Sequence, residues 1–150
     1  MKVLTVLVPT YNVEKYLRRC LDSLLLPEVL EEIEVLVVND GSKDGSADIA
    51  RAYEKKYPQT VVFVDKENGG HGSTINVGIE KAQGTYFKVL DSDDWVNIGD
   101  FIEFVKRLKE ETADAVICDY RKEHVYNGKS EYFEYKDLED GKNIISMRSI

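Results

Sequence analysis

Short apolar runs alternate with amphipathic segments along most of the chain. The apolar runs occupy residues 3–8, 33–38, 61–64 and 86–90, and they are rich in the β-branched and aromatic residues that favour the buried surface of a sheet. Between the runs, apolar residues recur three or four positions apart, which is the spacing of one face of a helix. The pattern therefore predicts four strands, each followed by a helix.

The predicted helices have recognisable ends and inner faces. Asn12 can cap the first helix and Pro27 stops it, whereas Gly84 is expected to close the third helix as its C′ residue, directly after the C-cap. The side chains expected on the buried faces are Leu17, Cys20 or Leu21, and Leu24 in the first helix, and Ile49, Ala52, Tyr53 and Tyr57 in the second. In the third they are Ile75, Ile79 and Ala82, and in the fourth Phe101, Phe104 or Val105, and Leu108.

The order of these elements predicts the fold class. Repeated strand–helix–strand units give a mostly parallel sheet with helices on both faces and right-handed crossovers. Residues 115–118 predict a fifth strand, and residues 125–133 predict a hairpin because Asn127-Gly128 fits a tight turn. We therefore expect an α/β fold followed by a C-terminal hairpin.

Polar residues follow each of the four strands at the point where the strand ends. Because the carboxyl ends of parallel strands open on one edge of a sheet, these residues are expected to meet in the crevice where such sheets bind ligands. They are Pro9, Thr10, Tyr11 and Asn12 after the first strand, Asp40 after the second, Asp65 and Lys66 after the third, and Asp91, Ser92, Asp93 and Asp94 after the fourth.

Three carboxylates lie within four residues at Asp91, Asp93 and Asp94. Neighbouring carboxylates repel each other and are costly to desolvate unless a cation or fixed donors compensate. Hard oxygen ligands suit Mg²⁺ or Mn²⁺, and such a metal typically binds the phosphates of a substrate. The alternative is a polar turn that caps the next helix, since Asp is common in turns and caps.

Composition narrows the class of protein. The 150 residues are enough for one domain with a real core, and they carry a formal net charge of −8. Such acidity argues against a nucleic-acid partner, which requires a basic face. The sequence has neither a signal peptide nor an apolar run long enough to span a membrane, so we expect a cytoplasmic protein. Both cysteines, Cys20 and Cys118, are expected to be buried thiols.

Three familiar nucleotide or metal motifs do not match. The turn after the first strand has no glycine, unlike the dinucleotide-binding G-x-G-x-x-G turn, and the chain has no G-x-x-x-x-G-K-[ST] loop. Residues 40–45 half-match a calcium loop, but the twelfth position is Arg51, where a bidentate Glu is needed. These three classes of site are therefore disfavoured.

Four motifs remain, each directly after one predicted strand. They are V-P-T-Y-N at 8–12, V-V-N-D-G-S-K-D-G-S at 37–46, N-G-G at 68–70 with N-V-G-I at 76–79, and L-D-S-D-D at 90–94. Together they resemble the family 2 glycosyltransferases of the GT-A fold, over residues 3–120. The resemblance implies a Rossmann-like GT-A fold. It also implies inverting transfer of a sugar from a nucleoside-diphosphate sugar, with UDP expected, to a glycan or lipid-linked acceptor in cell-surface polysaccharide synthesis.

The resemblance also implies roles for the polar residues. Thr10, Tyr11 and Asp40 would hold the nucleobase and ribose, while Asp91 and Asp93, the D-x-D motif, would hold the ribose and Mg²⁺ or Mn²⁺. The remaining expected contacts of the nucleotide-sugar are Pro9, Asn68, Gly70 and Ser92, with Asp94, His71 and Lys66 as further candidates. Two alternatives stay open from the residues alone: Asp40 capping its own turn, and Tyr11 lying in the core.

Two departures from the family pattern affect what we expect. Ile75 stands where many members carry an arginine near the donor, so the diphosphate would be met by the metal together with Lys66 or His71. The family's general base and acceptor site lie on a later segment that has no match before Ile150, so we assign no catalytic base.

We therefore expect residues 1–150 to form a single nucleotide-sugar-binding domain that ends before the acceptor-binding segment. Peripheral association with the inner face of the membrane would then depend on the missing C-terminal region. Two other functions stay open. One is a non-catalytic nucleotide-binding domain. The other is a sugar-phosphate nucleotidyltransferase, which is disfavoured because the Gly-rich first loop is absent.

Overall fold

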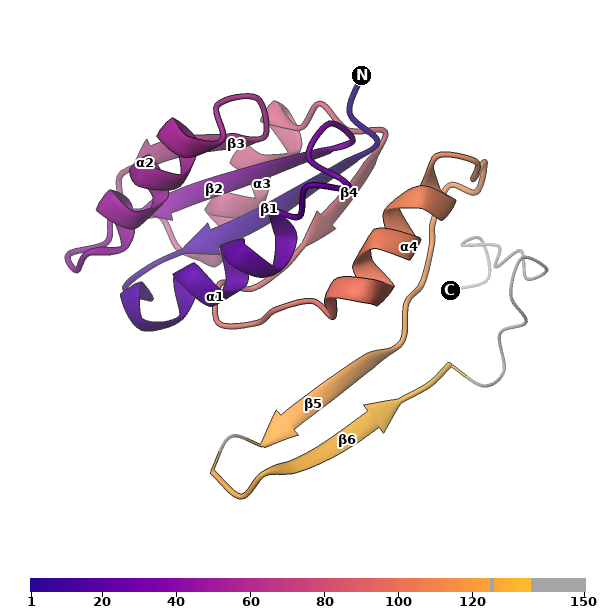
Figure 1. The fold of residues 1–150 in the computed structure, drawn as a ribbon. Helices are drawn as coiled ribbons and strands as arrows, with labels where there is room; N and C mark the ends of the chain where they lie inside the picture. Colours follow the sequence, from indigo (N-terminus) through magenta and orange to yellow (C-terminus); the bar gives the residue numbers. More distant parts are fainter. Residues whose placement is uncertain (125, 136–150) are drawn as a thin grey trace, which may run out of the picture. The chain divides into compact units, whose positions relative to one another are not determined.

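The computed structural model describes residues 1–124 and 126–135 and divides into two compact units, Met1–Glu111 and a second that begins at Thr112. No helix within these residues combines the length and apolar character needed to cross a bilayer. The first unit contains β1 (Leu4–Thr10), α1 (Glu14–Leu24), β2 (Ile33–Asp40), α2 (Ser46–Lys56), β3 (Val61–Lys66), α3 (His71–Lys81), β4 (Tyr86–Val89) and α4 (Ile98–Leu108), and the second contains β5 (Tyr120–His124) and β6 (Lys129–Phe133) (Figure 1).

The first four strands form one parallel sheet in the order β3-β2-β1-β4 (Figure 1). The register pairs Asp40 with Lys66, so β2 and β3 end at the same level. On the other side of β1, Leu7 lies opposite Val89 at the end of β4. This arrangement confirms the predicted α/β architecture and brings the four strand ends to one edge of the sheet.

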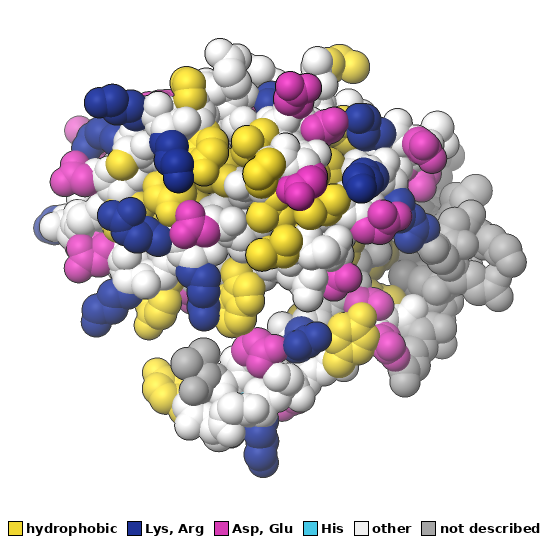
Figure 2. All heavy atoms as spheres, in the orientation of Figure 1, with side chains coloured by type: hydrophobic (Ala, Val, Ile, Leu, Met, Phe, Trp, Pro, Cys, Tyr) yellow, Lys and Arg dark blue, Asp and Glu magenta, His cyan; other side chains and the backbone are white. Residues whose placement is uncertain are grey.

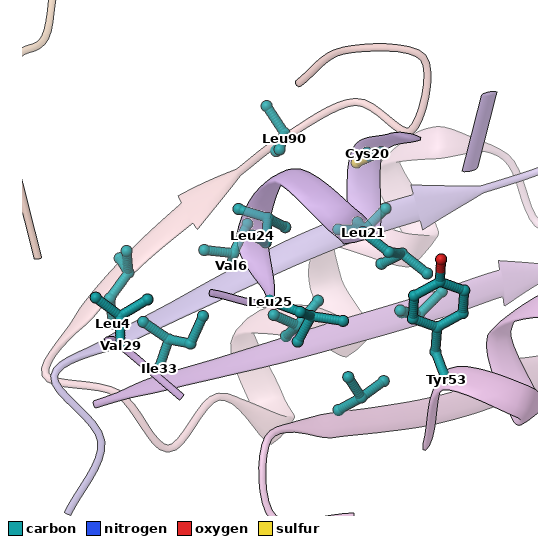
Figure 3. Close-up of a cluster of buried hydrophobic side chains, with 14 of the residues drawn as sticks. Leu4, Val6, Cys20, Leu21, Leu24, Leu25, Val29, Ile33, Tyr53 and Leu90 are labelled. Atoms are coloured by element: carbon teal, nitrogen blue, oxygen red, sulfur yellow. The ribbon is translucent and has the colours of Figure 1, made fainter. Parts of the chain in front are cut away.

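Alternating residues of β1 supply two separate cores. Val6 and Val8 belong to a cluster with side chains of α1, α2 and α4, part of which is drawn in Figure 3. Leu7 points to the other face, as the two-residue period of a strand requires, and joins a smaller cluster packed against α3. A Cβ added at Gly78 would lie only 2.6 Å from Leu7 Cδ2, so this glycine allows α3 to approach the sheet closely.

Two predicted helix faces are wrong in part. Ala52 is exposed, and α2 buries Ala50 instead. Ile79 is 61% exposed, whereas α3 buries Thr74 and Gly78. The close approach of α3 explains this result, because the small residues Thr74 and Gly78, spaced four apart, take the positions nearest the sheet. Ile75 and Val77 pack beside them and are half-buried.

Two predicted helix ends are also wrong. Asn12 does not cap α1, whose N-cap position is Val13. Asn12 instead adopts a left-handed φ of 53°, and its side-chain oxygen accepts a hydrogen bond from the Lys43 N–H (2.8 Å). The C-cap of α3 is Ala82, so Gly84 lies one residue beyond the expected C′ position. An added Cβ at Gly84 would be 2.4 Å from the backbone N of Thr5. Because glycine has no side chain, the backbone at Gly84 can pack closely against β1.

The second unit contains the predicted hairpin. Tyr120 of β5 lies opposite Phe133 of β6, and their rings stack with centroids 4.7 Å apart. Gly128 has a φ of 64°, as a tight hairpin turn requires. The hairpin is thus confirmed for the described residues, while Val125, which was also predicted to belong to it, lies outside them.

The predicted fifth strand at residues 115–118 is wrong, because this segment has no regular structure. Val116 and Ile117 are 40% and 52% exposed, and Cys118 is exposed instead of buried. A strand forms only against a partner that completes its backbone hydrogen bonds, and the two sheets of the described residues include no partner for this segment. Cys20, by contrast, is fully buried as predicted.

Charged side chains of both signs are mixed on the visible face of the molecule. Figure 2 shows Lys and Arg side chains interspersed with Asp and Glu around a group of apolar side chains. No continuous basic surface is visible on the side of the described residues that is shown there.

Candidate functional site

Asp40, the last residue of β2, is nearly buried and is hydrogen-bonded through both carboxylate oxygens. Its Oδ1 accepts from Lys66 Nζ (2.5 Å) and from the Gly69 N–H (2.9 Å), and its Oδ2 accepts from the Gly70 N–H (2.8 Å). The Asp40 carbonyl also accepts from Asn68 Nδ2 (3.0 Å). Since each carboxylate oxygen can accept two hydrogen bonds, one accepting position remains, on Oδ2.

Lys66, the last residue of β3, has three hydrogen-bond acceptors within the protein. Its ammonium donates to Asp40 Oδ1, to the Glu67 carbonyl (2.6 Å) and to Ser73 Oγ (2.9 Å). An ammonium carries three protons, so all of them are used in this arrangement. Lys66 therefore ties the end of β2 and the first turn of α3 to the end of β3.

The environment of Asp40 favours its charged form. Burial by itself raises the pKa of the carboxyl, but the Lys66 ammonium and the N–H groups of Gly69 and Gly70 lower it, and the resulting pKa lies below the usual value. Asp40 is therefore an anion whose charge is balanced inside the protein.

The loop between β3 and α3 depends on two glycines. Gly70 has a φ of 83°, a conformation that residues with a Cβ rarely adopt. A Cβ at Gly69 would lie 2.8 Å from Ser73 Oγ and 3.1 Å from Lys66 Nζ. The loop can thus direct two successive N–H groups at the end of β2, which places the predicted residues Asn68 and Gly70 beside it.

The loops that follow β1 and β2 are joined by side-chain hydrogen bonds. The Asn12 N–H donates to Ser42 Oγ (3.1 Å), and the Glu14 N–H donates to Asp44 Oδ2 (3.1 Å). Asp44 also accepts from the N–H of Ser46, the first residue of α2 (3.0 Å). The first two loops of the strand edge therefore form one connected surface.

Of the three nucleotide-sugar contacts expected at the end of β1, only Tyr11 is exposed. Pro9 and Thr10 are buried, and Thr10 Oγ1 donates to the Val8 carbonyl (3.1 Å). Tyr11 is 49% exposed. Its ring is therefore not part of the core and is accessible to a ligand.

The acidic loop, residues 91–96, follows β4. Asp91, Asp93 and Asp94 are exposed, whereas Ser92 is buried. Partial burial and the neighbouring carboxylates of Asp93 and Asp91 raise the pKa of Asp94, against a smaller opposite effect of Arg19. The three acids are thus close enough to repel one another, and they face solvent.

His71 connects the acidic loop with the region around Asp40. Its Nε2 lies 4.0 Å from Asp91 Oδ1, and the preceding residue, Gly70, donates its N–H to Asp40. The structure therefore brings together the predicted residues of the second, third and fourth strand ends.

The acidic loop offers carboxylate oxygens, the ligands that Mg²⁺ and Mn²⁺ prefer. No group of three or more His, Cys, Asp or Glu side chains among the described residues is arranged to hold a metal ion by itself. In phosphate-handling sites, however, Mg²⁺ is usually held by one or two carboxylates together with water and substrate phosphates. Asp91 and Asp93, which are both exposed, fit that kind of shared site.

Two residues near the site were not predicted from the sequence. Ser73 accepts from Lys66 and donates to the Gly70 carbonyl (2.7 Å), and its position in the first turn of a helix after two glycines was the available signal. Arg19 lies with its guanidinium carbon 3.5 Å from the ring centre of Trp95. Nothing local to Arg19 indicates this contact, because α1 and the acidic loop are far apart in the sequence.

Comparison with known proteins identifies what this arrangement resembles. The sequence profile described as glycosyl transferase family 2 matches residues 5–141. The Bacillus subtilis protein named "Minor teichoic acid biosynthesis protein GgaB" is 41% identical over 98 residues, which cover 65% of this chain and 11% of that protein. Two other curated relatives, from B. subtilis and Streptococcus pneumoniae, are covered over 36% and 16% of their lengths, so this chain spans only a part of them.

Solved structures of glycosyltransferases are also similar to this chain. S. aureus TarS 1–349 in complex with UDP superimposes with a TM-score of 0.62 at 33% identity, over 73% of this chain and 32% of that one. The mannosyltransferase PcManGT from Pyrobaculum calidifontis, in complex with GDP-Man and Mn²⁺, gives a TM-score of 0.61 at 27% identity, over 69% of this chain and 31% of that one.

Proposed function

This chain belongs to glycosyl transferase family 2, and from that premise we propose that it binds a nucleoside-diphosphate sugar, with UDP as the nucleotide, at the strand edge bearing Asp40 and the acidic loop. The observation that carries the proposal is the junction at Gly70 and His71, where one residue donates to Asp40 and the next lies 4.0 Å from Asp91. A nucleotide lying along this edge would have its base near Asp40 and its diphosphate near the acids.

Hydrogen-bonding capacity and the exposed tyrosine support a uracil base. The one remaining accepting position on Asp40 Oδ2 suits a base with a ring N–H donor, such as uracil N3–H, and excludes an acceptor such as cytosine N3. Tyr11 offers an exposed ring on which a base can stack. Guanine also carries a ring N–H, but TarS, which has been solved with UDP and with UDP-GlcNAc, is more similar in sequence than the GDP-Man-bound PcManGT. We therefore favour UDP.

Asp91 and Asp93 would hold Mg²⁺ or Mn²⁺ in this proposal, with Ser92 buried between them to fix the loop. When bound, the metal supplies Lewis-acid stabilisation of the diphosphate as it departs. The Mn²⁺ of PcManGT supports the choice of a divalent ion. His71, 4.0 Å from Asp91, would lie close to the phosphates and offers a hydrogen-bond donor there.

The proposed reaction is a single displacement with inversion. An acceptor hydroxyl oxygen forms a bond to the anomeric carbon of the sugar while the bond from that carbon to the diphosphate oxygen breaks. The nucleoside diphosphate leaves, and the acceptor proton passes to a base. The described residues of this chain hold the donor, and none of them is assigned as that base.

The acceptor would be a glycan or a lipid-linked glycan. The teichoic acid role in the name of GgaB supports synthesis of a cell-surface polymer. A single nucleotide-sugar-binding domain over residues 1–150, a cytoplasmic location and attachment to the inner membrane face stay predictions.

Calorimetric titration with UDP, with and without Mn²⁺, tests this proposal. We expect metal-dependent binding that raises thermal stability, since a ligand at 100 times its Kd stabilises by about 2.7 kcal/mol. Asp93→Ala should abolish the metal dependence, whereas Asp48→Ala, a similar change on the exposed surface of α2, should not. If the affinity for UDP is the same with and without Mn²⁺, the result would favour a nucleotide-binding domain without transferase chemistry. If UDP does not bind, the proposal is rejected.

A further inference from the structure

Helix α1 contacts the acidic loop at three places, and none of these contacts uses a carboxylate. Cys20 Sγ donates to the Asp91 backbone carbonyl (3.9 Å), and the other two contacts lie at the end of the loop. The guanidinium of Arg19 lies 3.5 Å from the ring centre of Trp95. One turn later on the same helix, Ser23 Oγ accepts a hydrogen bond from the Val96 N–H (3.2 Å). These contacts fix the end of the loop that follows the acids.

Ser23 is itself held in one orientation. It is 7% exposed, and its hydroxyl proton is donated to the Cys20 carbonyl (2.7 Å). The oxygen lone pairs are therefore directed at Val96, whose N–H would lose its partner without them. Val96 is half-buried, and an N–H that is partly shielded from water costs free energy when it has no acceptor. This hydrogen bond therefore keeps the loop against α1.

Arg19 is the cation on α1 that contacts the loop, yet it does not pair with the acids. Among the described residues, the ion pairs include none between Arg19 and Asp91, Asp93 or Asp94. Trp95 instead binds the guanidinium on its ring face. The carboxylate oxygens consequently keep their accepting positions for a cation from solution.

We propose that Arg19 and Ser23 are positioning residues of the donor site, which hold the acidic loop in its metal-binding conformation through Trp95 and Val96. The inference rests on the proposed function, because it assumes that Asp91 and Asp93 bind the metal. Three adjacent carboxylates repel one another and would spread apart in a loose loop. Contacts made outside the carboxylates oppose this spreading and block no ligand atom.

The single tryptophan of the chain provides a direct measurement. Trp95 is the only tryptophan in the sequence, and bound Mn²⁺, being paramagnetic, should quench its fluorescence. Titrating Mn²⁺ in the presence of saturating UDP gives the metal affinity of the intact chain. Mg²⁺, which is diamagnetic, should compete without quenching. Asp93→Ala should remove the quenching.

Arg19→Gln and Arg18→Gln form a matched pair for this titration. Both remove one exposed positive charge from α1, but only Arg19 stacks on Trp95. We expect Arg19→Gln to weaken Mn²⁺ binding about fivefold relative to Arg18→Gln, the effect of losing an exposed cation–π contact. If Arg19 acted only through its charge, its loss would strengthen the binding of Mn²⁺, so equal or tighter binding would overturn the inference.

Ser23 gives an independent test. Ser23→Ala should weaken Mn²⁺ binding, and Ser23→Thr, which keeps the hydroxyl, should restore most of it. If Ser23→Ala does not fold, the comparison of Mn²⁺ affinity between Arg19→Gln and Arg18→Gln is the deciding test. A wild-type chain that shows no Mn²⁺ quenching would reject both the metal site and this inference, whereas normal wild-type quenching with no difference between Arg19→Gln and Arg18→Gln would reject the inference only.

Discussion

Replacing Lys66 by methionine should destabilise the protein through Asp40. The side chains of Lys66 and Asp40 are 20% and 5% exposed, so the ion pair is largely shielded from solvent. Lys66→Met keeps the length of the side chain but leaves Asp40 with only the N–H groups of Gly69 and Gly70. The change therefore tests whether the charge of Asp40 is balanced inside the protein.

The structure gives an expected size for the effect. Breaking a buried ion pair by removing one partner costs about 3–5 kcal/mol. Asp40 keeps two of its three donors after Lys66→Met, so we expect the lower end, about 3 kcal/mol. For a protein of this size that corresponds to a fall in Tm of roughly 6–12 °C. Lys43→Met, at an exposed loop lysine whose side chain makes no ion pair among the described residues, is the control, and it should change Tm little.

The pH dependence adds a second signature. Because the pKa of Asp40 is lowered in the folded protein, its contribution to stability is fully present above its unfolded pKa, about 4, and is lost as the pH falls through the lower folded value. Without Lys66, burial should raise the pKa of Asp40, and its contribution should then fall as the pH rises. The stability difference between the wild type and Lys66→Met should be large at pH 7 and small at pH 3.

Urea denaturation followed by Trp95 fluorescence at several pH values measures both effects. Two results would refute the proposal that Lys66 balances the charge of Asp40. One is an equal denaturation midpoint for Lys66→Met and Lys43→Met at pH 7. The other is a stability difference between the wild type and Lys66→Met that does not become smaller at low pH.

Two further predictions concern packing and thiol chemistry. Gly84→Ala should destabilise by about 3 kcal/mol, the upper end of the usual cost of overpacking, because the new Cβ would lie 2.4 Å from the backbone N of Thr5. Gly72→Ala, where nothing lies within 4 Å of the new Cβ, is the control, and equal urea midpoints for the two variants would contradict the packing argument. Burial and nearby acids raise the pKa of Cys20 to about 12, and Cys118 is exposed, so a thiol reagent at pH 8 should modify one cysteine in the native chain and two after unfolding. Mass spectrometry would count the modified thiols, and two rapid modifications in the native chain would show that Cys20 is accessible.

The sequence alone was sufficient to predict that the ends of the four strands lie at one edge of the sheet. The apolar runs set the strands, and parallel pairing then requires that the residues following them share one edge. Asp40 and Asp91 could therefore be placed in one region before any coordinates. The same reasoning failed at residues 115–118, because an apolar run of four residues does not specify whether a partner strand is present.

The partners of Asp40 could not be predicted in the same way. Lys66 was read as a possible counter-charge for the diphosphate, because a lysine after a strand has no sequence signal that tells an internal acceptor from an external one. Its position depends on Ser73 and on the positive φ of Gly70, which are properties of the folded loop. The face of α3 was misread for a related reason: Ile79 is the larger apolar residue, but only Gly78 leaves room for the sheet.

The carboxylates at this edge divide into two kinds, and the division bears on how an acidic chain can bind a diphosphate. Asp40 is buried and neutralised by Lys66 and backbone donors, so it adds little repulsion toward an incoming anion. Asp91 and Asp93 are exposed and unbalanced, and they are the groups that a divalent cation would neutralise. With a net charge of −8 on the chain, donor binding should therefore depend on the metal far more than on salt. Donor affinity that is unchanged by chelation but improves steadily with ionic strength would mean that general repulsion, and not the acidic loop, controls access to this edge.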